Sequence, residues 1–101
     1  MPLDVIARSE SHSTNFFNVS LSTEIQTPLV SNDNREGILI FNDADQDLLV
    51  SFTDTVSEDE YTFKILPGGY YESGSVTYMG AVHLVWVASG TGKALVTELE
   101  G

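Results

Sequence analysis

The chain has 101 residues, 42% of them apolar, which is enough for one domain with one hydrophobic core and too apolar for a disordered chain. Fifteen acidic residues against four basic ones give a formal net charge of −11, which argues against binding to nucleic acids or anionic membrane surfaces. The chain has no cysteine, which rules out disulfides and thiolate metal sites.

Residues 1–14 are polar and show no sustained periodicity, so we expect an extended N-terminal arm, or else a disordered tail, before a single domain over residues 15–101. This N-terminus lacks the basic region and apolar run of a secretory signal. The longest apolar stretch, around residues 82–88, is far shorter than the roughly 20 residues that span a bilayer. We therefore expect a soluble protein made without an export signal.

Apolar residues that alternate with polar ones predict about eight short strands separated by turn residues, because successive side chains of a strand point to opposite faces. Pro28 indicates that one of these strands lies at a sheet edge or ends there, because proline has no amide proton. Another strand is apolar on both faces, at residues 38–41, which predicts a central strand covered from two sides. The predicted strands cover residues 16–21, 23–30, 38–41, 48–52, the two halves of 61–72, 82–88 and 93–99.

The connections between the predicted strands are short and rich in turn residues. Residues 42–47 predict a turn inside a hairpin over residues 38–52, and residues 89–92 predict a second hairpin loop with two glycines. Residues 66–69, Leu-Pro-Gly-Gly, predict a type II turn in which proline takes the second position and glycine the third. Residues 53–60 are acidic and polar, which predicts an exposed loop.

No segment has a sustained 3.6-residue apolar stripe, and the short connections leave no room for crossover helices between parallel strands. The sequence therefore predicts an all-β domain. An antiparallel β-sandwich is the favoured architecture and a barrel is the alternative, since both bury the same alternating pattern.

Asp43, Asp45 and Asp47 stand at alternate positions, as in an oxygen-rich calcium loop, and Asp54 lies where a twelfth-position ligand would fall. Leu48, however, occupies the position where that loop requires glycine. We interpret the segment as a solvated turn and predict no metal site. The run at residues 58–60 is interpreted as a solvated acidic loop, with docking of a basic partner as the functional alternative.

No catalytic constellation is visible in the sequence, so we predict that the chain is not an enzyme and needs no cofactor. His83 lies in the middle of a predicted strand on the face opposite Trp86, where a lone histidine is typically a surface or packing residue. Ser11 and His12 are adjacent in the predicted arm and lack a rigid base to activate a serine nucleophile. Residues 89–93 contain Gly-Thr-Gly-Lys but lack the spacing and the helix of a phosphate-binding loop.

The predicted strands and their neighbouring residues carry more aromatic side chains than can all face the core in an alternating pattern. Adjacent residues of a strand face opposite ways, so one residue of each adjacent pair is expected in the core and the other is a candidate for a subunit interface. Exposed aromatic rings that stack on sugars are the alternative. The candidate interface residues are Phe16, Phe17, Tyr70, Tyr71 and Tyr78.

Five short motifs follow one another along the chain: Arg-Glu-Gly-Ile-Leu-Ile-Phe-Asn at 35–42, Leu-Leu-Val at 48–50, Tyr-Thr-Phe-Lys-Ile at 61–65, Pro-Gly-Gly-Tyr-Tyr-Glu at 67–72 and Ala-Leu-Val-Thr-Glu at 94–98. This ordered set resembles small structural proteins of tailed bacteriophages. The resemblance covers about residues 35–100. It implies an all-β virion component without a catalytic motif.

From this resemblance we expect a capsid decoration (cement) protein that stabilises the head by binding the major capsid protein. We expect a homo-oligomer, with a trimer as the first hypothesis, that is assembled into virions in the host cytoplasm. A tail, baseplate or neck component is one alternative. A carbohydrate-binding module for host attachment is the other.

Overall fold

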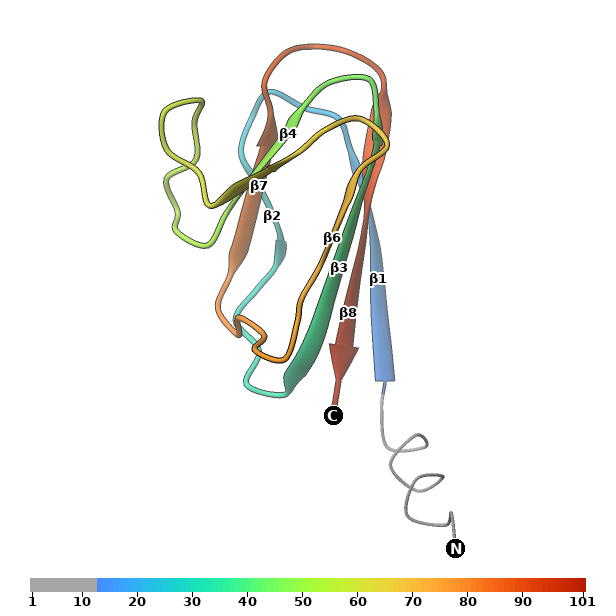
Figure 1. Cartoon of the computed structure of the whole chain (residues 1–101), viewed down its shortest axis with the longest axis vertical. Helices are drawn as coiled ribbons and strands as arrows, with labels where there is room; N and C mark the ends of the chain where they lie inside the picture. Colours follow the sequence, from blue (N-terminus) through green and yellow to red (C-terminus); the bar gives the residue numbers. More distant parts are fainter. Residues whose placement is uncertain (1–12) are drawn as a thin grey trace, which may run out of the picture.

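The structure is a computed structural model that describes residues 13–101, and these residues form eight β-strands and no helix (Figure 1). The arm predicted over residues 1–14 lies outside the described residues, except that Ser13 and Thr14 belong to the first strand. The strands are β1 (Ser13–Ser20), β2 (Gln26–Leu29), β3 (Arg35–Ala44), β4 (Leu48–Ser51), β5 (Phe63–Ile65), β6 (Tyr70–Glu72), β7 (Val82–Trp86) and β8 (Gly92–Glu100).

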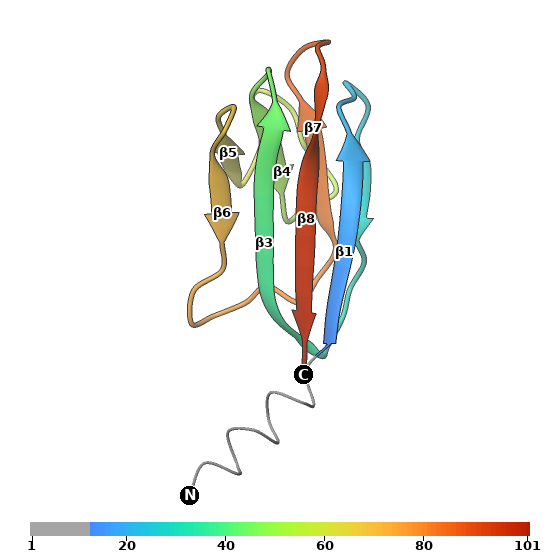
Figure 2. The ribbon, with the colours of Figure 1, turned by 90° about the vertical axis from the view of Figure 1, so that its right-hand side faces the viewer.

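The strands form two four-stranded antiparallel sheets packed face to face, with the longer one in front in Figure 2. We call the sheet β1-β8-β3-β6 the long sheet and the sheet β2-β7-β4-β5 the short sheet. The predicted antiparallel β-sandwich is confirmed. The barrel alternative is wrong, because the two sheets of residues 13–101 do not close on each other.

The strand order is that of a jelly roll. The pairs β1/β8, β2/β7, β3/β6 and β4/β5 are those of one long hairpin, and rolling it up adds the pairs β3/β8 and β4/β7. Residues 52–62 connect β4 to β5 at the tip of this hairpin. As a result, β4 and β5 are the one pair of consecutive strands that are neighbours in a sheet of the described chain.

Both hairpins predicted from the sequence are wrong. β3 lies in the long sheet and β4 in the short sheet, so residues 45–47 cross from one sheet to the other, and residues 87–91 cross in the same way between β7 and β8. Alternation indicates which side chains are buried, whereas a short loop can join neighbours in one sheet or strands in two facing sheets.

The turn between β5 and β6 has the predicted geometry. Gly68 has a φ of 79°, and the Gly69 amide donates a hydrogen bond to the Leu66 carbonyl at 2.8 Å. A positive φ at the third position with this bond defines a type II turn, which here turns the corner from the short sheet to the long sheet. The edge position predicted from Pro28 is also confirmed, because β2 is the terminal strand of the short sheet.

The core lies between the two sheets and is built from alternate residues of their strands. Ile38 and Ile40 are fully buried, but Leu39 between them is 39% exposed, so the prediction that residues 38–41 are covered from two sides is wrong. A chain of this length makes two layers, and no described segment covers the other face of β3. The buried core residues are Val19, Leu29, Ile38, Ile40, Leu48, Val50, Ile65, Val82, Leu84, Trp86, Ala94 and Val96.

Candidate functional site

Side chains of the long sheet that point away from the core form an apolar surface, which we call the outer face. Strand register builds it in rows, because residues directly opposite each other point to the same side of a sheet. One row places Phe16 opposite Thr97 and Thr97 opposite Leu39, and the next places Leu95 opposite Phe41 and Phe41 opposite Tyr70. The outer face consists of Phe16, Leu39, Phe41, Tyr70, Leu95, Thr97 and Leu99.

Charged residues lie at the margins of the outer face. Glu72 is opposite Leu39 at the β6 edge, and Asp43 pairs with Lys93 beyond the last apolar row. In a chain with a net charge of −11, this surface is therefore depleted of charge. Depletion of charge with enrichment in tyrosine and phenylalanine is typical of the centre of a protein interface.

The two adjacent aromatic pairs are split between the faces of the long sheet. Phe16 and Tyr70 lie on the outer face, with 56% and 67% of their surfaces exposed. Phe17 and Tyr71 lie on the core side, opposite Val96 and Ile40. Phe17 keeps 38% exposure because β1 is the edge strand, whereas Tyr71 stacks on the ring of Phe63.

Tyr78 lies apart from the outer face. Its ring stacks on Phe52 with a centroid separation of 4.2 Å, and its hydroxyl donates a hydrogen bond to the Phe52 carbonyl at 2.8 Å. Both rings pack against the core as partly buried side chains. Of the five candidate interface residues, the structure therefore brings Phe16 and Tyr70 together on one surface and assigns Tyr78 to internal packing.

The short sheet has its own apolar surface facing away from the core, but a loop covers it. Leu49 and Val85 point outward and pack with Val56 of the segment 52–62, which projects from the sandwich beside β4 and β5 (Figure 1). The prediction that residues 53–60 are exposed holds for the acidic side chains and fails at Val56, which is buried. Among residues 13–101, the outer face of the long sheet has no comparable cover.

Two pockets lie between this projecting loop and the short sheet. One is lined by Asp47, Leu49, Glu58, Tyr61, Lys64 and Val87, and the other extends past Val56 toward Ile25. In the described part of the chain, no histidine lines either pocket, and the titratable side chains at the first one are Asp47, Glu58, Tyr61 and Lys64.

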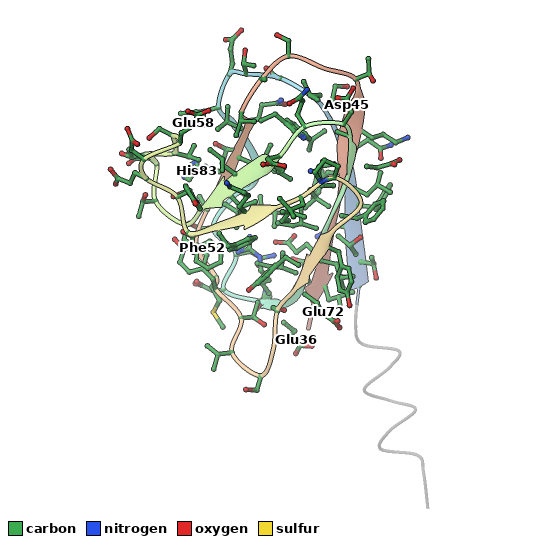
Figure 3. The ribbon with its side chains drawn as sticks, turned by 45° about the horizontal axis from the view of Figure 1, so that its top comes forward. Glu36, Asp45, Phe52, Glu58, Glu72 and His83 are labelled. Atoms are coloured by element: carbon green, nitrogen blue, oxygen red, sulfur yellow. The ribbon has the colours of Figure 1, made fainter. Side chains whose placement is uncertain are left out.

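Among the carboxylates considered for calcium, that of Asp45 has a structural role. The Asp45 carboxylate accepts hydrogen bonds from the Thr91 amide at 2.9 Å and the Thr91 hydroxyl at 3.2 Å, which joins the two loops that cross between the sheets. Asp45 lies at the end of the sandwich, away from Glu58 on the projecting loop (Figure 3). No three acidic or histidine side chains within residues 13–101 are grouped so that they could hold a metal ion.

His83 points away from the core on the short sheet, on the face opposite Trp86, and its Nδ1 lies 2.8 Å from the Thr27 hydroxyl. Ser11 and His12 lie outside the described residues. His83 is thus a partly buried residue on the outward side of the short sheet, within the prediction of a surface or packing residue.

Arg35 and Glu98 form a buried ion pair between β3 and β8 that sequence reasoning missed. Arg35 Nε donates to Glu98 at 2.8 Å, and the same guanidinium donates to the carbonyls of Val30, Tyr78 and Gly80. Burial raises the pKa of Glu98, but hydrogen bonds from Asn15 and Arg35 outweigh it and hold that pKa below its ordinary value. Each of the three guanidinium nitrogens donates to a partner within the protein, so we interpret this group as the support of one end of the long sheet.

The sequence contained a signal for the outer face. Residues 38–41 and 94–96 are apolar at consecutive positions, with a further leucine at position 99, and a two-layer sandwich can bury one side of each strand. The side chains of β3 and β8 on the other side, which the core does not bury, are Leu39, Phe41, Leu95 and Leu99.

No helix in residues 13–101 is long and apolar enough to cross a membrane. Comparison of the chain with protein-family models, with curated proteins and with solved structures finds no match in any of the three.

Proposed function

We propose that this chain is a structural protein of a tailed-phage virion, a capsid decoration (cement) protein that binds the major capsid protein through the outer face of its long sheet. The observation that carries the proposal is this apolar, uncovered face on a chain that is otherwise strongly acidic. Contiguous exposed apolar surface on a small domain marks a site of interaction with another macromolecule.

Two further points support a binding role. The rows of the outer face are held by the paired strands β1, β8, β3 and β6, so the surface is ordered before a partner arrives and little entropy is lost on binding. Jelly rolls are common in viral capsid domains, which is an analogy at the level of the fold. The ordered motifs over about residues 35–100 point to the same class of protein.

The test is co-sedimentation of the purified chain with heads and, separately, with tails of the phage that encodes it. We expect binding to heads, reduced at least 10-fold in a Leu39→Ala/Tyr70→Ala double variant. Val76→Ala is the matched control, because Val76 is 84% exposed and lies outside the sheets, and it should bind as the unchanged chain does. Binding to tails alone would favour a tail, baseplate or neck component, and binding to neither particle would overturn the proposal.

Carbohydrate binding is the second candidate, and the exposed ring of Tyr70 favours it. Aromatic rings presented on a β-sheet can stack on sugars, and lectin domains also use the jelly roll. A glycan array separates the two candidates. A hit that is lost in Tyr70→Ala would support host attachment, whereas an array without hits removes this candidate.

A further inference from the structure

The four edge strands of the sandwich differ in how they are protected. β5 and β6 have three residues each, and β2 contains Pro28 and an irregular register with β7. Short edges, proline and bulges are the usual means by which proteins prevent a sheet edge from pairing with another chain. β1 has none of these features, since its eight residues pair with β8 in one continuous register.

The register shows which backbone groups of β1 face outward. The Leu21 amide donates to the Gly92 carbonyl at 3.0 Å, and this pair continues the β1/β8 register. In antiparallel pairs, hydrogen-bonded positions alternate. Odd-numbered residues of β1 therefore bond to β8, and even-numbered ones point their amides and carbonyls to the free edge. Gln26 Nε2 donates to the Ser20 carbonyl, so the open segment runs from Thr14 to Asn18.

The chemistry of β1 suits pairing with an identical strand. Residues 13–20, Ser-Thr-Asn-Phe-Phe-Asn-Val-Ser, contain no charge in a chain with 15 acidic residues, so two copies would place no like charges opposite each other. The open segment is centred on Phe16. Antiparallel pairing about that residue places Phe16 opposite its own copy and Thr14 opposite Asn18 of the second chain, which uses all the outward-facing groups of the segment.

We propose that two copies of this chain associate through antiparallel pairing of their β1 edges, about a two-fold axis beside Phe16. The two long sheets become one continuous sheet, and the two outer faces join into a single larger apolar surface. Pairing of identical antiparallel edges closes after two chains, so this geometry favours a dimer over the trimer expected at first. The proposal concerns the chain alone and does not depend on the identity of the proposed capsid partner.

Cysteine cross-linking tests the register, because the chain has no cysteine of its own. Opposed residues of a hydrogen-bonded antiparallel pair have Cα atoms about 5.5 Å apart, within the range of a disulfide. We expect Phe16→Cys to form a cross-linked dimer under oxidation. We expect Thr14→Cys and Asn18→Cys chains to cross-link when the two are mixed. Neither variant should cross-link alone, because in the proposed dimer each of these residues lies roughly 13 Å from the same residue of the second chain. The mixed pair retains Phe16 and so tests the register even if Phe16→Cys weakens the dimer.

Sedimentation equilibrium tests the association itself. We expect the mass to rise from 11.0 kDa toward twice that value with concentration. Asn18→Pro removes an amide that faces the free edge and spares the bonds to β8, so it should raise the dimer dissociation constant at least 10-fold while the circular dichroism spectrum stays unchanged. Asn18→Ala keeps the amide and should dimerise within about twofold of the unchanged chain. An unchanged 101-residue chain that remains at 11.0 kDa, with no cross-link in the mixed pair, would overturn the proposal.

Discussion

Arg35 and Glu98 form a buried ion pair on the face of the long sheet opposite the outer face, and Arg35 Nε lies 2.8 Å from a Glu98 carboxylate oxygen. The Arg35 guanidinium also donates to three backbone carbonyls, so one side chain connects β3, β8 and two loops. Such a group is costly to break from one side, because the remaining charge stays buried without its partner.

Arg35→Met should therefore lower the free energy of unfolding by about 3–5 kcal/mol, because Glu98 and the carbonyls lose their donor. Lys93→Met is the matched control, since it removes the same charge from an exposed position on β8 and should change stability by less than about 1 kcal/mol. Urea unfolding followed by tryptophan fluorescence measures both. Equal losses in the two variants would contradict a supporting role for the ion pair.

Stability should also depend on pH through Glu98 and Glu100. Burial raises the pKa of Glu98, but hydrogen bonds from Asn15 and Arg35 outweigh this effect, so that the net result is a lowered pKa. Hydrogen bonds from Asn32 and Asn15 lower the pKa of Glu100. Folding thus favours the ionised carboxylates. Their contribution is fully present above the ordinary value of 4.5 and is lost as the pH falls through the lowered values.

We therefore expect the free energy of unfolding to fall between about pH 5 and pH 3, with a shallower slope in Glu98→Gln. Urea titrations at a series of fixed pH values measure the free energy of unfolding. Glu58→Gln on the exposed loop is the control, because its carboxylate lies outside the hydrogen-bonded group around Glu98 and Glu100. A slope in Glu98→Gln as steep as in the unchanged chain would show that other groups cause the acid sensitivity.

Two glycines with positive φ should respond differently to alanine. Gly92 has a φ of 120°, and a Cβ there would collide with Ala44 and the Asp43 carbonyl of β3. Gly68 has a φ of 79° with nothing within 4 Å of the added atom. We expect Gly92→Ala to cost about 2–5 kcal/mol from strain and overpacking, and Gly68→Ala about 1–2 kcal/mol from strain alone. Thermal unfolding of the two variants tests this order, and a reversed order would contradict the close approach of β8 to β3.

The alternation of apolar and polar residues predicts local structure well and the pairing of distant strands poorly. Alternation at Phe17, Val19 and Leu21 predicts a strand over residues 16–21, which overlaps β1 but misses its start at Ser13, and the Pro67-Gly68 pair predicts the corner between β5 and β6. The assignment of strands to sheets failed at residues 45–47, because a short polar loop has the same composition whether it joins neighbours or crosses between layers. That choice depends on partners far away in the sequence.

The same contrast between local and long-range information holds for the buried polar residues and for the outer face. The sequence predicts a turn at Asn42, but this residue is fully buried in β3, where it accepts a hydrogen bond from Trp86 and donates to the carbonyls of Gln46 and Ile65. Such partners cannot be inferred from neighbouring residues. The splitting of Phe16 from Phe17 and of Tyr70 from Tyr71, in contrast, follows from alternation alone.

Leu39 and Ile40 are adjacent in β3 and should separate binding from folding. Ile40 is fully buried, so Ile40→Ala should lower the free energy of unfolding by about 2–5 kcal/mol through the cavity that it leaves. Leu39 is on the outer face, so Leu39→Ala should cost less than about 1 kcal/mol. The order reverses for association with capsid, where Leu39→Ala removes interface contacts and Ile40→Ala, measured under conditions where it is folded, keeps them. Urea unfolding and head co-sedimentation on the same two variants measure both quantities. If Leu39→Ala bound heads as well as the unchanged chain while Ile40→Ala did not, the outer face would not be the surface that contacts the capsid.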